Sequence, residues 1–200
     1  MSDMALAALV SSRICHDLIS PVGAIGNGIE LMQMSPGAGK EEIDLIADCA
    51  QTASAALQFM RVAFGARAPE EVIAIHELDS LCSSYFQRRK IVFDWSAASR
   101  DELPFGTVQP LLMLAMIGAS TMPRGGTLRL TDHDDELGWR ADADMIRASD
   151  QVLRLMAAKP SIGEVAPGEV HILILWQAAA ARGQTLHWLE DETGADVRCA

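Results

Sequence analysis

The sequence predicts an α+β protein in which an antiparallel helical hairpin precedes an α/β sandwich. Two long N-terminal segments carry apolar residues at alternating steps of three and four, a spacing typical of packed helices. After them, apolar helical segments alternate with short strands of period-two hydrophobicity. A chain of 200 residues has room for one or two domains. We expect residues 1–65 to form the hairpin and residues 66–200 the α/β domain.

The hairpin prediction depends on two apolar seams and the turn between them. The first seam consists of Ala8, Ser11, Cys15, Leu18, Val22, Ile25, Ile29 and Met32. The segment "SPGAG" (35–39) then interrupts the helix with a proline and two glycines. The second seam consists of Ile43, Ile46, Ala50, Ala53, Leu57, Met60 and Phe64. A lone hairpin cannot bury apolar faces on both helices, so we expect a homodimer whose two hairpins form a four-helix bundle.

The rest of the chain alternates between helical and strand patterns after the linker "GARAPEE" (65–71). Helices are predicted at 75–88, 105–121, 150–158 and 169–183. Strands are predicted at 90–97, at two places around a polar turn within 124–143, and at 184–191 and 195–200. This order predicts a mostly antiparallel sheet covered by helices, which is an α/β sandwich.

Composition argues against several classes of function. A net charge of −11 and a pI of about 4.8 disfavour binding to nucleic acid, which needs a basic surface. No segment approaches the 18 apolar residues of a membrane span, so we expect no membrane partner. The four cysteines are scattered without a CxxC pair, which favours a reduced, cytoplasmic protein without disulfides or zinc. The acidic segment "TDHDDE" (131–136) is predicted to be a polar hairpin turn and not a metal site.

A polar stripe on the first helix is the candidate site. On a helical projection His16, Ser20, Gly23 and Asn27 lie within roughly 60° of one another, beside the apolar seam. Pro21 removes a backbone hydrogen bond one turn after His16 and is expected to kink the helix. The small side chains leave room for another protein to approach the imidazole. We therefore expect partners to dock on this stripe.

The chemistry of His16 and Asp17 fits phosphoryl transfer. An imidazole in water is mostly neutral and nucleophilic at pH 7. A neighbouring carboxylate can hold the second ring N–H and accept its proton while the other nitrogen attacks phosphorus. From this spacing alone, an ordinary surface His-Asp pair is the more frequent explanation.

The segment "HDLISPVGAI" (16–25) resembles the H-box of sensor histidine kinases, whose pattern is His-Glu-Leu-Arg-Thr-Pro-Leu-x-x-Ile. The resemblance implies that His16 is the phosphoacceptor and Asp17 the acidic base. Ser20 stands at a position implicated in phosphatase activity in that family. Ile19 replaces the usual arginine, which changes the surface presented to partners.

The second half of the chain resembles the ATP-binding domain of the same kinases, with key residues replaced. Met113 and Ile117 stand where the family has two asparagines, one of which is a magnesium ligand. Neither side chain offers the oxygen that Mg²⁺ requires. Glu169 and His171 replace glycines of a later nucleotide-binding segment, and the glycines expected near 142–148 are absent from the sequence. The resemblance implies that the fold is retained, that ATP chemistry is lost and that no cofactor is bound.

A hairpin of this kind joined to a degenerate ATPase-like domain resembles the ChpT-type histidine phosphotransferases of alphaproteobacteria. The resemblance implies a relay in which the receiver domain of a hybrid histidine kinase phosphorylates His16, and His16 passes the group to a response regulator. The Mg²⁺ would belong to the receiver domain. Two alternatives stay open on the sequence alone: a divergent histidine kinase that still binds ATP, and a non-catalytic dimeric regulator that binds response regulators.

Overall fold

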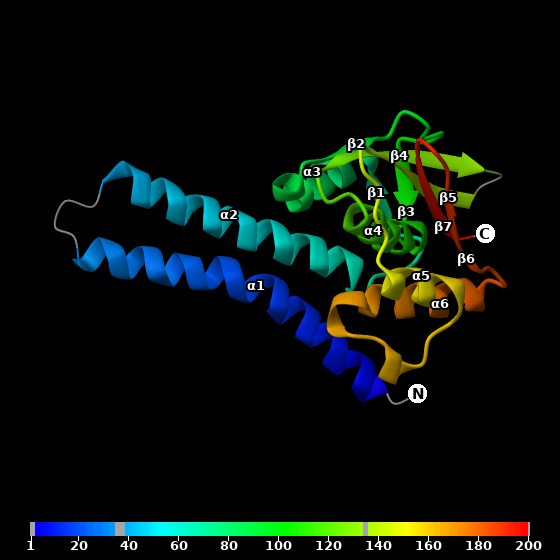
Figure 1. Cartoon of the computed structure of the whole chain (residues 1–200), viewed down its shortest axis with the longest axis horizontal. Coiled ribbons are helices and arrows are strands. Elements are labelled where there is room, and N and C mark those ends of the chain that lie inside the picture. Colours follow the sequence, from blue (N-terminus) through cyan, green and yellow to red (C-terminus); the bar gives the residue numbers. More distant parts are fainter. Residues whose placement is uncertain (1–2, 35–38, 134–135, 200) are drawn as a thin grey trace.

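The first two helices form a long hairpin that projects from the rest of the molecule (Figure 1). The computed structural model describes residues 3–34, 39–133 and 136–199. Helix α1 (Asp3–Met34) and helix α2 (Lys40–Ala63) run side by side, as the seams predict. Residues 35–38 of the predicted turn lie outside the described residues, while Gly39 precedes α2 and donates its backbone N–H to the Glu42 carboxylate at 2.8 Å.

The two helices meet on a different flank from the one that the first seam marks. Pro21 and Gly28 are the buried residues of α1. A Cβ at Gly28 would lie 2.7 Å from Ile46 of α2, so the glycine allows the helices to approach closely. Five of the eight residues of the first seam are instead exposed: Ala8, Ser11, Cys15, Val22 and Ile29. Helix α1 continues through Pro21, and Figure 1 shows it bent near its middle.

The second half contains a five-stranded sheet in the described part of the chain, with strand order β2-β4-β5-β7-β6. Its strands are β2 (Ile91–Asp94), β4 (Gly126–His133), β5 (Glu136–Asp142), β6 (Leu186–Glu190) and β7 (Gly194–Cys199). Strand β2 is parallel to β4, and the other pairs are antiparallel. Residues 134–135 of the predicted polar turn lie outside the described residues. A short antiparallel pair, β1 (Val72–Ala74) with β3 (Glu102–Pro104), is absent from the sequence prediction.

Helices cover this sheet, so the predicted α+β class is confirmed. They are α3 (Ile75–Phe86), α4 (Phe105–Ser120), α5 (Asp150–Ala157) and α6 (Val170–Ala181), with 3₁₀ turns η1 (Gln87–Arg89), η2 (Ile162–Glu164) and η3 (Pro167–Glu169). Helix α4 is apolar on nearly all sides and is largely buried. The indole of Trp139 in β5 donates to the Leu111 carbonyl of α4 at 2.8 Å, which ties the helix to the sheet. Within the described ranges, no helix has the length and apolar character needed to cross a bilayer.

The apolar core continues from the sheet domain into the hairpin. The last turns of α2 contribute Phe59, Met60, Val62 and Ala63 to the same buried cluster as α3, α4 and the sheet. The ring of Phe59 stacks on Tyr85 of α3, with centroids 4.1 Å apart and planes 7° from parallel. This end of the hairpin, called the hairpin root below, comprises residues 56–63 of α2 and the part of α1 around residues 13–17. Packing therefore fixes the hairpin root against the sheet domain.

Candidate functional site

His16 lies on α1 at the hairpin root and points into solvent. Its side chain is 81% exposed. Its Nδ1 atom is 3.2 Å from Oδ1 of Asp17, the residue that follows it. With Nδ1 engaged by the carboxylate, Nε2 is the ring nitrogen left available to an approaching partner.

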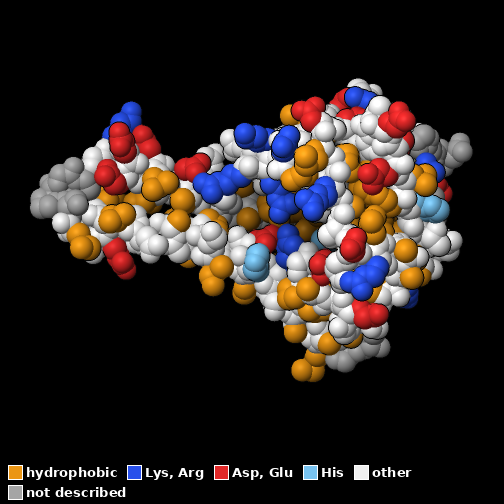
Figure 2. Space-filling model, in the orientation of Figure 1, with side chains coloured by type: hydrophobic (Ala, Val, Ile, Leu, Met, Phe, Trp, Pro, Cys, Tyr) orange, Lys and Arg blue, Asp and Glu red, His pale blue; other side chains and the backbone are white. Residues whose placement is uncertain are grey.

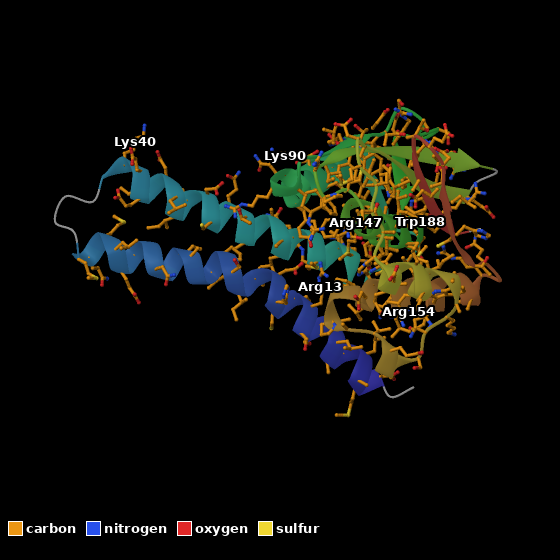
Figure 3. All side chains as sticks on the ribbon, in the orientation of Figure 1. Arg13, Lys40, Lys90, Arg147, Arg154 and Trp188 are labelled. Atoms are coloured by element: carbon orange, nitrogen blue, oxygen red, sulfur yellow. The ribbon has the colours of Figure 1, made fainter. Side chains whose placement is uncertain are left out.

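Asp17 is held by residues from two helices. Its Oδ2 atom accepts hydrogen bonds from Nε of Arg13 at 3.2 Å and from the Tyr85 hydroxyl at 2.9 Å. The Arg13 Nη2 atom lies 3.0 Å from the same oxygen, one helical turn before Asp17. Arg13 also donates to the Gly168 carbonyl of η3, and Figure 3 shows Arg13 where α1 meets the sheet domain. An ordinary surface pair would leave Asp17 exposed, whereas its side chain is only 16% exposed, because Arg13 and Tyr85 of α3 lie against it.

The surroundings of Asp17 favour its charged form. Burial alone would raise the pKa of this carboxyl group. The positive charge of Arg13 and the hydrogen bonds from His16, Tyr85 and Arg13 outweigh burial, so the pKa of Asp17 lies below its ordinary value. A carboxylate with a lowered pKa is suited to holding a ring N–H and balancing a positive imidazolium, more than to keeping a proton.

A second histidine lies behind this cluster. His171 of α6 is buried, and its Nδ1 atom has no hydrogen-bond partner among the described residues. The pKa of His171 is lowered to about 3, mainly by burial and also by the charges of Arg13 and Arg89, with Asp17 acting in the opposite direction. His171 is therefore neutral at physiological pH and contributes packing.

The predicted docking stripe is exposed together with His16. Ser20, Gly23 and Asn27 all face solvent, and the Ile19 side chain is 73% exposed. A Cβ added at Gly23 would meet no atom within 4 Å, so the glycine leaves open space beside the stripe. An apolar side chain as exposed as Ile19 is typical of a contact surface.

The residues that replace the kinase asparagines are part of the core. Met113 and Ile117 of α4 are buried with the other apolar residues of this helix. The end of the domain near His171 is occupied by α1, which contacts η3 and α6. Within the described residues, no group of three or more His, Cys, Asp or Glu side chains is placed to hold a metal ion.

A basic groove extends from the site across the sheet domain. One hollow of about 370 Å³ is lined by Arg88, Arg89, Lys90 and Arg124, with no carboxylate among the described lining residues. A second hollow, of about 340 Å³, lies between α2 and α3 and shares Arg88 and Lys90 with the first. It is also lined by Asp48, which pairs with Arg88 at 2.6 Å, so the positive charge of the groove comes mainly from the first hollow. Tyr85 also lines it and so joins it to the Asp17 cluster. Figure 2 shows Lys and Arg side chains gathered on the face where the hairpin root meets the sheet domain.

The sequence motif singled out His16 and Asp17 as candidates but did not include the two residues that hold Asp17. Arg13 precedes Asp17 by four positions, a spacing that places two helical side chains side by side, so the pair was readable from the sequence. Tyr85 is 68 positions away, and no local pattern connects it with Asp17.

Comparisons with known proteins agree with this architecture. Residues 75–194 match the model of a family described as the histidine phosphotransferase C-terminal domain. Protein phosphotransferase ChpT of Brucella abortus (strain 2308) is 40% identical over 160 residues, which cover 78% of this chain and 76% of that protein. A solved 1.7 Å structure of a bacterial phosphotransferase is 31% identical, has a TM-score of 0.84, and covers 100% of this chain and 98% of its own. The histidine kinase AdeS of Acinetobacter baumannii is more distant, with 8% identity, a TM-score of 0.48, and 92% of this chain and 95% of that chain covered.

The buried His171 predicts a loss of stability in mild acid. Unfolded histidine has a pKa of about 6.5, whereas the pKa of folded His171 is about 3, so the unfolded chain binds the extra proton between these values. The free energy of unfolding therefore decreases as pH falls. The contribution of His171 to this decrease is about 2 kcal/mol between pH 7 and pH 5. Urea unfolding at both pH values should show a smaller loss for His171→Gln than for wild type. Equal losses in the two proteins would contradict the burial of a neutral imidazole.

Proposed function

The chain belongs to the histidine phosphotransferase family, and we propose that His16 is the residue that carries its phosphoryl group. The observation that supports this choice is that the two carboxylate oxygens of Asp17 have different partners. One carboxylate oxygen is fixed by Arg13 and Tyr85, and the other faces Nδ1 of His16. This arrangement leaves Nε2 free on a side chain that is 81% exposed, where a second protein can reach it.

The transfer step follows from this geometry. The lone pair of Nε2 attacks the phosphorus of an aspartyl phosphate on a partner, the P–O bond to that aspartate breaks, and the aspartate leaves as a carboxylate. The imidazole keeps its Nδ1–H and gains positive charge, which the Asp17 carboxylate balances. The reverse sequence returns the phosphoryl group to another aspartate. The chain's own contribution is to orient the ring and stabilise its charge.

The proposed partners are receiver domains. The receiver domain of a hybrid histidine kinase would supply the phosphoryl group, and a response regulator would accept it. Both would dock on the exposed stripe of Ile19, Ser20, Gly23 and Asn27. The Mg²⁺ that steadies the phosphoryl oxygens would be held by the receiver. Nucleotide would have no part in the transfer, since Met113 and Ile117 offer no oxygen ligand for Mg²⁺. The proposal also includes a cytoplasmic location, where such partners reside.

The hairpin supports the proposal of a homodimer. Val22 and Ile29 of α1 and Ile43 and Leu57 of α2 are between 44% and 55% exposed in the single chain. They belong to the two apolar seams of the hairpin, and a second copy would cover them in a four-helix bundle. The dimer would then present two copies of His16, each beside its own docking stripe.

The basic groove supports a second area of contact with the partner. One of its hollows is lined by Tyr85, whose hydroxyl binds Asp17, so the groove adjoins the hairpin root. A local positive surface on a chain of net charge −11 favours one orientation of an acidic partner over others. We therefore include Arg89 and Arg124 in the proposed docking surface.

The first test is label uptake by the purified protein. Wild type should take up acid-labile phosphate from a phosphorylated receiver domain and none from ATP, and His16→Ala should take up none from either. Asp17→Asn should transfer at least about 100-fold more slowly, because it loses the charge that balances the imidazolium. Label from ATP alone would make the protein a kinase, and label on His16→Ala would place the phosphoryl group elsewhere.

The second prediction concerns the dimer. Light scattering should give wild type a mass of about twice the 21.5 kDa of one chain. Leu57→Glu should give the single-chain mass, because it would bury a charge in the bundle without a partner. Gln51→Glu, an exposed position on another face of α2, is the matched control and should remain dimeric. A monomeric wild type, or a dimeric Leu57→Glu, would contradict the proposed bundle.

The third prediction concerns the basic groove. Arg124→Glu should raise the KM for a receiver domain roughly fivefold or more, the factor that corresponds to about 1 kcal/mol of charge interaction. The kcat should change little, and the KM effect should shrink as salt rises. Arg154→Glu makes the same charge change at an exposed position of α5 and should leave KM unchanged. If both variants raise the KM equally, the net charge of the protein and not the position of the groove determines receiver binding, which would contradict the proposed docking surface.

A further inference from the structure

Tyr85 contacts the site from outside the hairpin. Its hydroxyl donates to Oδ2 of Asp17 at 2.9 Å, although 68 positions separate the two residues in the chain. Arg13 binds the same oxygen and leaves Oδ1 to face His16. The tyrosine is therefore a contact between α3 and the carboxylate that orients the imidazole.

The aromatic ring of Tyr85 is itself fixed in place. It stacks on Phe59 of α2 with centroids 4.1 Å apart, and it meets Phe86 edge to face at 4.7 Å. Phe86 continues through Phe93 to Trp139 of the sheet, with centroids 5.5 Å and 5.3 Å apart. A row of packed rings thus connects the central strand β5 with the hydroxyl that holds Asp17. Such packing defines the position of a polar group more closely than a flexible surface side chain would.

The Tyr85 hydroxyl remains a hydrogen-bond donor over the whole working range of pH. Burial and the nearby negative charge of Asp17 raise the pKa of Tyr85 to about 12. The phenol therefore stays protonated, and the Asp17 oxygen that it meets stays occupied. Arg13 alone would not define the carboxylate equally well, because it approaches from the same helix and also binds the Gly168 carbonyl.

We propose that Tyr85 is a positioning residue for phosphoryl transfer: by holding Oδ2 of Asp17, it directs Oδ1 to Nδ1 of His16 and keeps the ring in the tautomer with Nε2 free. This inference rests on the proposed role of His16 as phosphoacceptor. It gives the C-terminal domain a direct part in the transfer step through α3, in addition to any part in docking.

The alternative explanation is that Tyr85 contributes to packing or docking only. Its ring belongs to the core, and it also lines the hollow between α2 and α3. A packing role would appear as reduced stability, and a docking role as a raised KM. A positioning role would instead lower kcat at saturating receiver and change the proton distribution on the His16 ring.

The test uses Tyr85→Phe, which keeps the ring and its stacking and removes only the hydroxyl. We expect kcat for transfer from a phosphorylated receiver domain to fall about 10-fold, the effect of one hydrogen bond to a charged group, with KM unchanged. Nitrogen-15 NMR of labelled histidine should show His16 with its proton on Nδ1 in wild type and shared between both nitrogens in the variant. Ser80→Ala removes an exposed hydroxyl from the same helix and should change neither quantity.

The outcomes separate the two proposals. If wild type takes up no label on His16, the proposed function fails. If wild type is labelled and Tyr85→Phe keeps its kcat and the His16 tautomer, only the positioning role is overturned. A raised KM with an unchanged tautomer would also overturn it, because the hydroxyl would then serve docking. Thermal unfolding of both proteins shows whether the variant remains folded at the assay temperature.

Discussion

The site depends on one partly buried carboxylate. Asp17 joins α1 to α3 through Tyr85, and its partner Arg13 joins α1 to η3 through Gly168. Removing a carboxylate from water is unfavourable, and here a guanidinium and a phenol compensate. The same contacts that make the burial tolerable also leave one oxygen directed at His16. Electrostatic compensation and orientation of the imidazole are therefore a single arrangement.

The hairpin supplies the exposed surface around His16, and the sheet domain supplies most of the packed core. Helix α1 keeps small or exposed side chains around His16, which leaves the imidazole accessible. Helices α4 and α6 are buried on almost every side and give the sheet domain its rigidity. The row of aromatic rings from Trp139 of β5 to Phe59 of α2 connects the packed sheet domain with the site. An exposed imidazole can in this way be held by a well-ordered support.

The sequence was sufficient for the long elements because their apolar periods are sustained over many residues. Helices α1, α2, α4 and α6 and strands β4 and β5 were predicted on that basis. The pair β1–β3 was missed because three residues carry no measurable period, and the pairing of Ile73 with Leu103 is long-range. The spacing of apolar residues also did not reveal which flank of α1 contacts α2. An apolar seam has the same spacing whether it packs against a helix of its own chain or against a second copy.

The same limit applies to the site. His16 and Asp17 are adjacent in the chain, so a motif could identify them. Tyr85 enters only through the tertiary fold, because its contact with Asp17 depends on how α3 packs on the hairpin root. A local pattern singles out the proposed phosphoacceptor, whereas the residue proposed to position it is found only in the folded structure.

The core that α2 shares with the sheet domain also constrains how this protein can evolve. Phe59, Met60 and Ala63 are buried only because α3 and α4 cover them. A hairpin transferred to another protein by recombination after residue 65 would bring an uncovered apolar surface with it. Its Asp17 would also lose the hydrogen bond from Tyr85 of α3. If the exposed stripe of α1 is the docking surface proposed above, such a chain changes its partners more readily through point substitutions on that stripe than through exchange of whole modules.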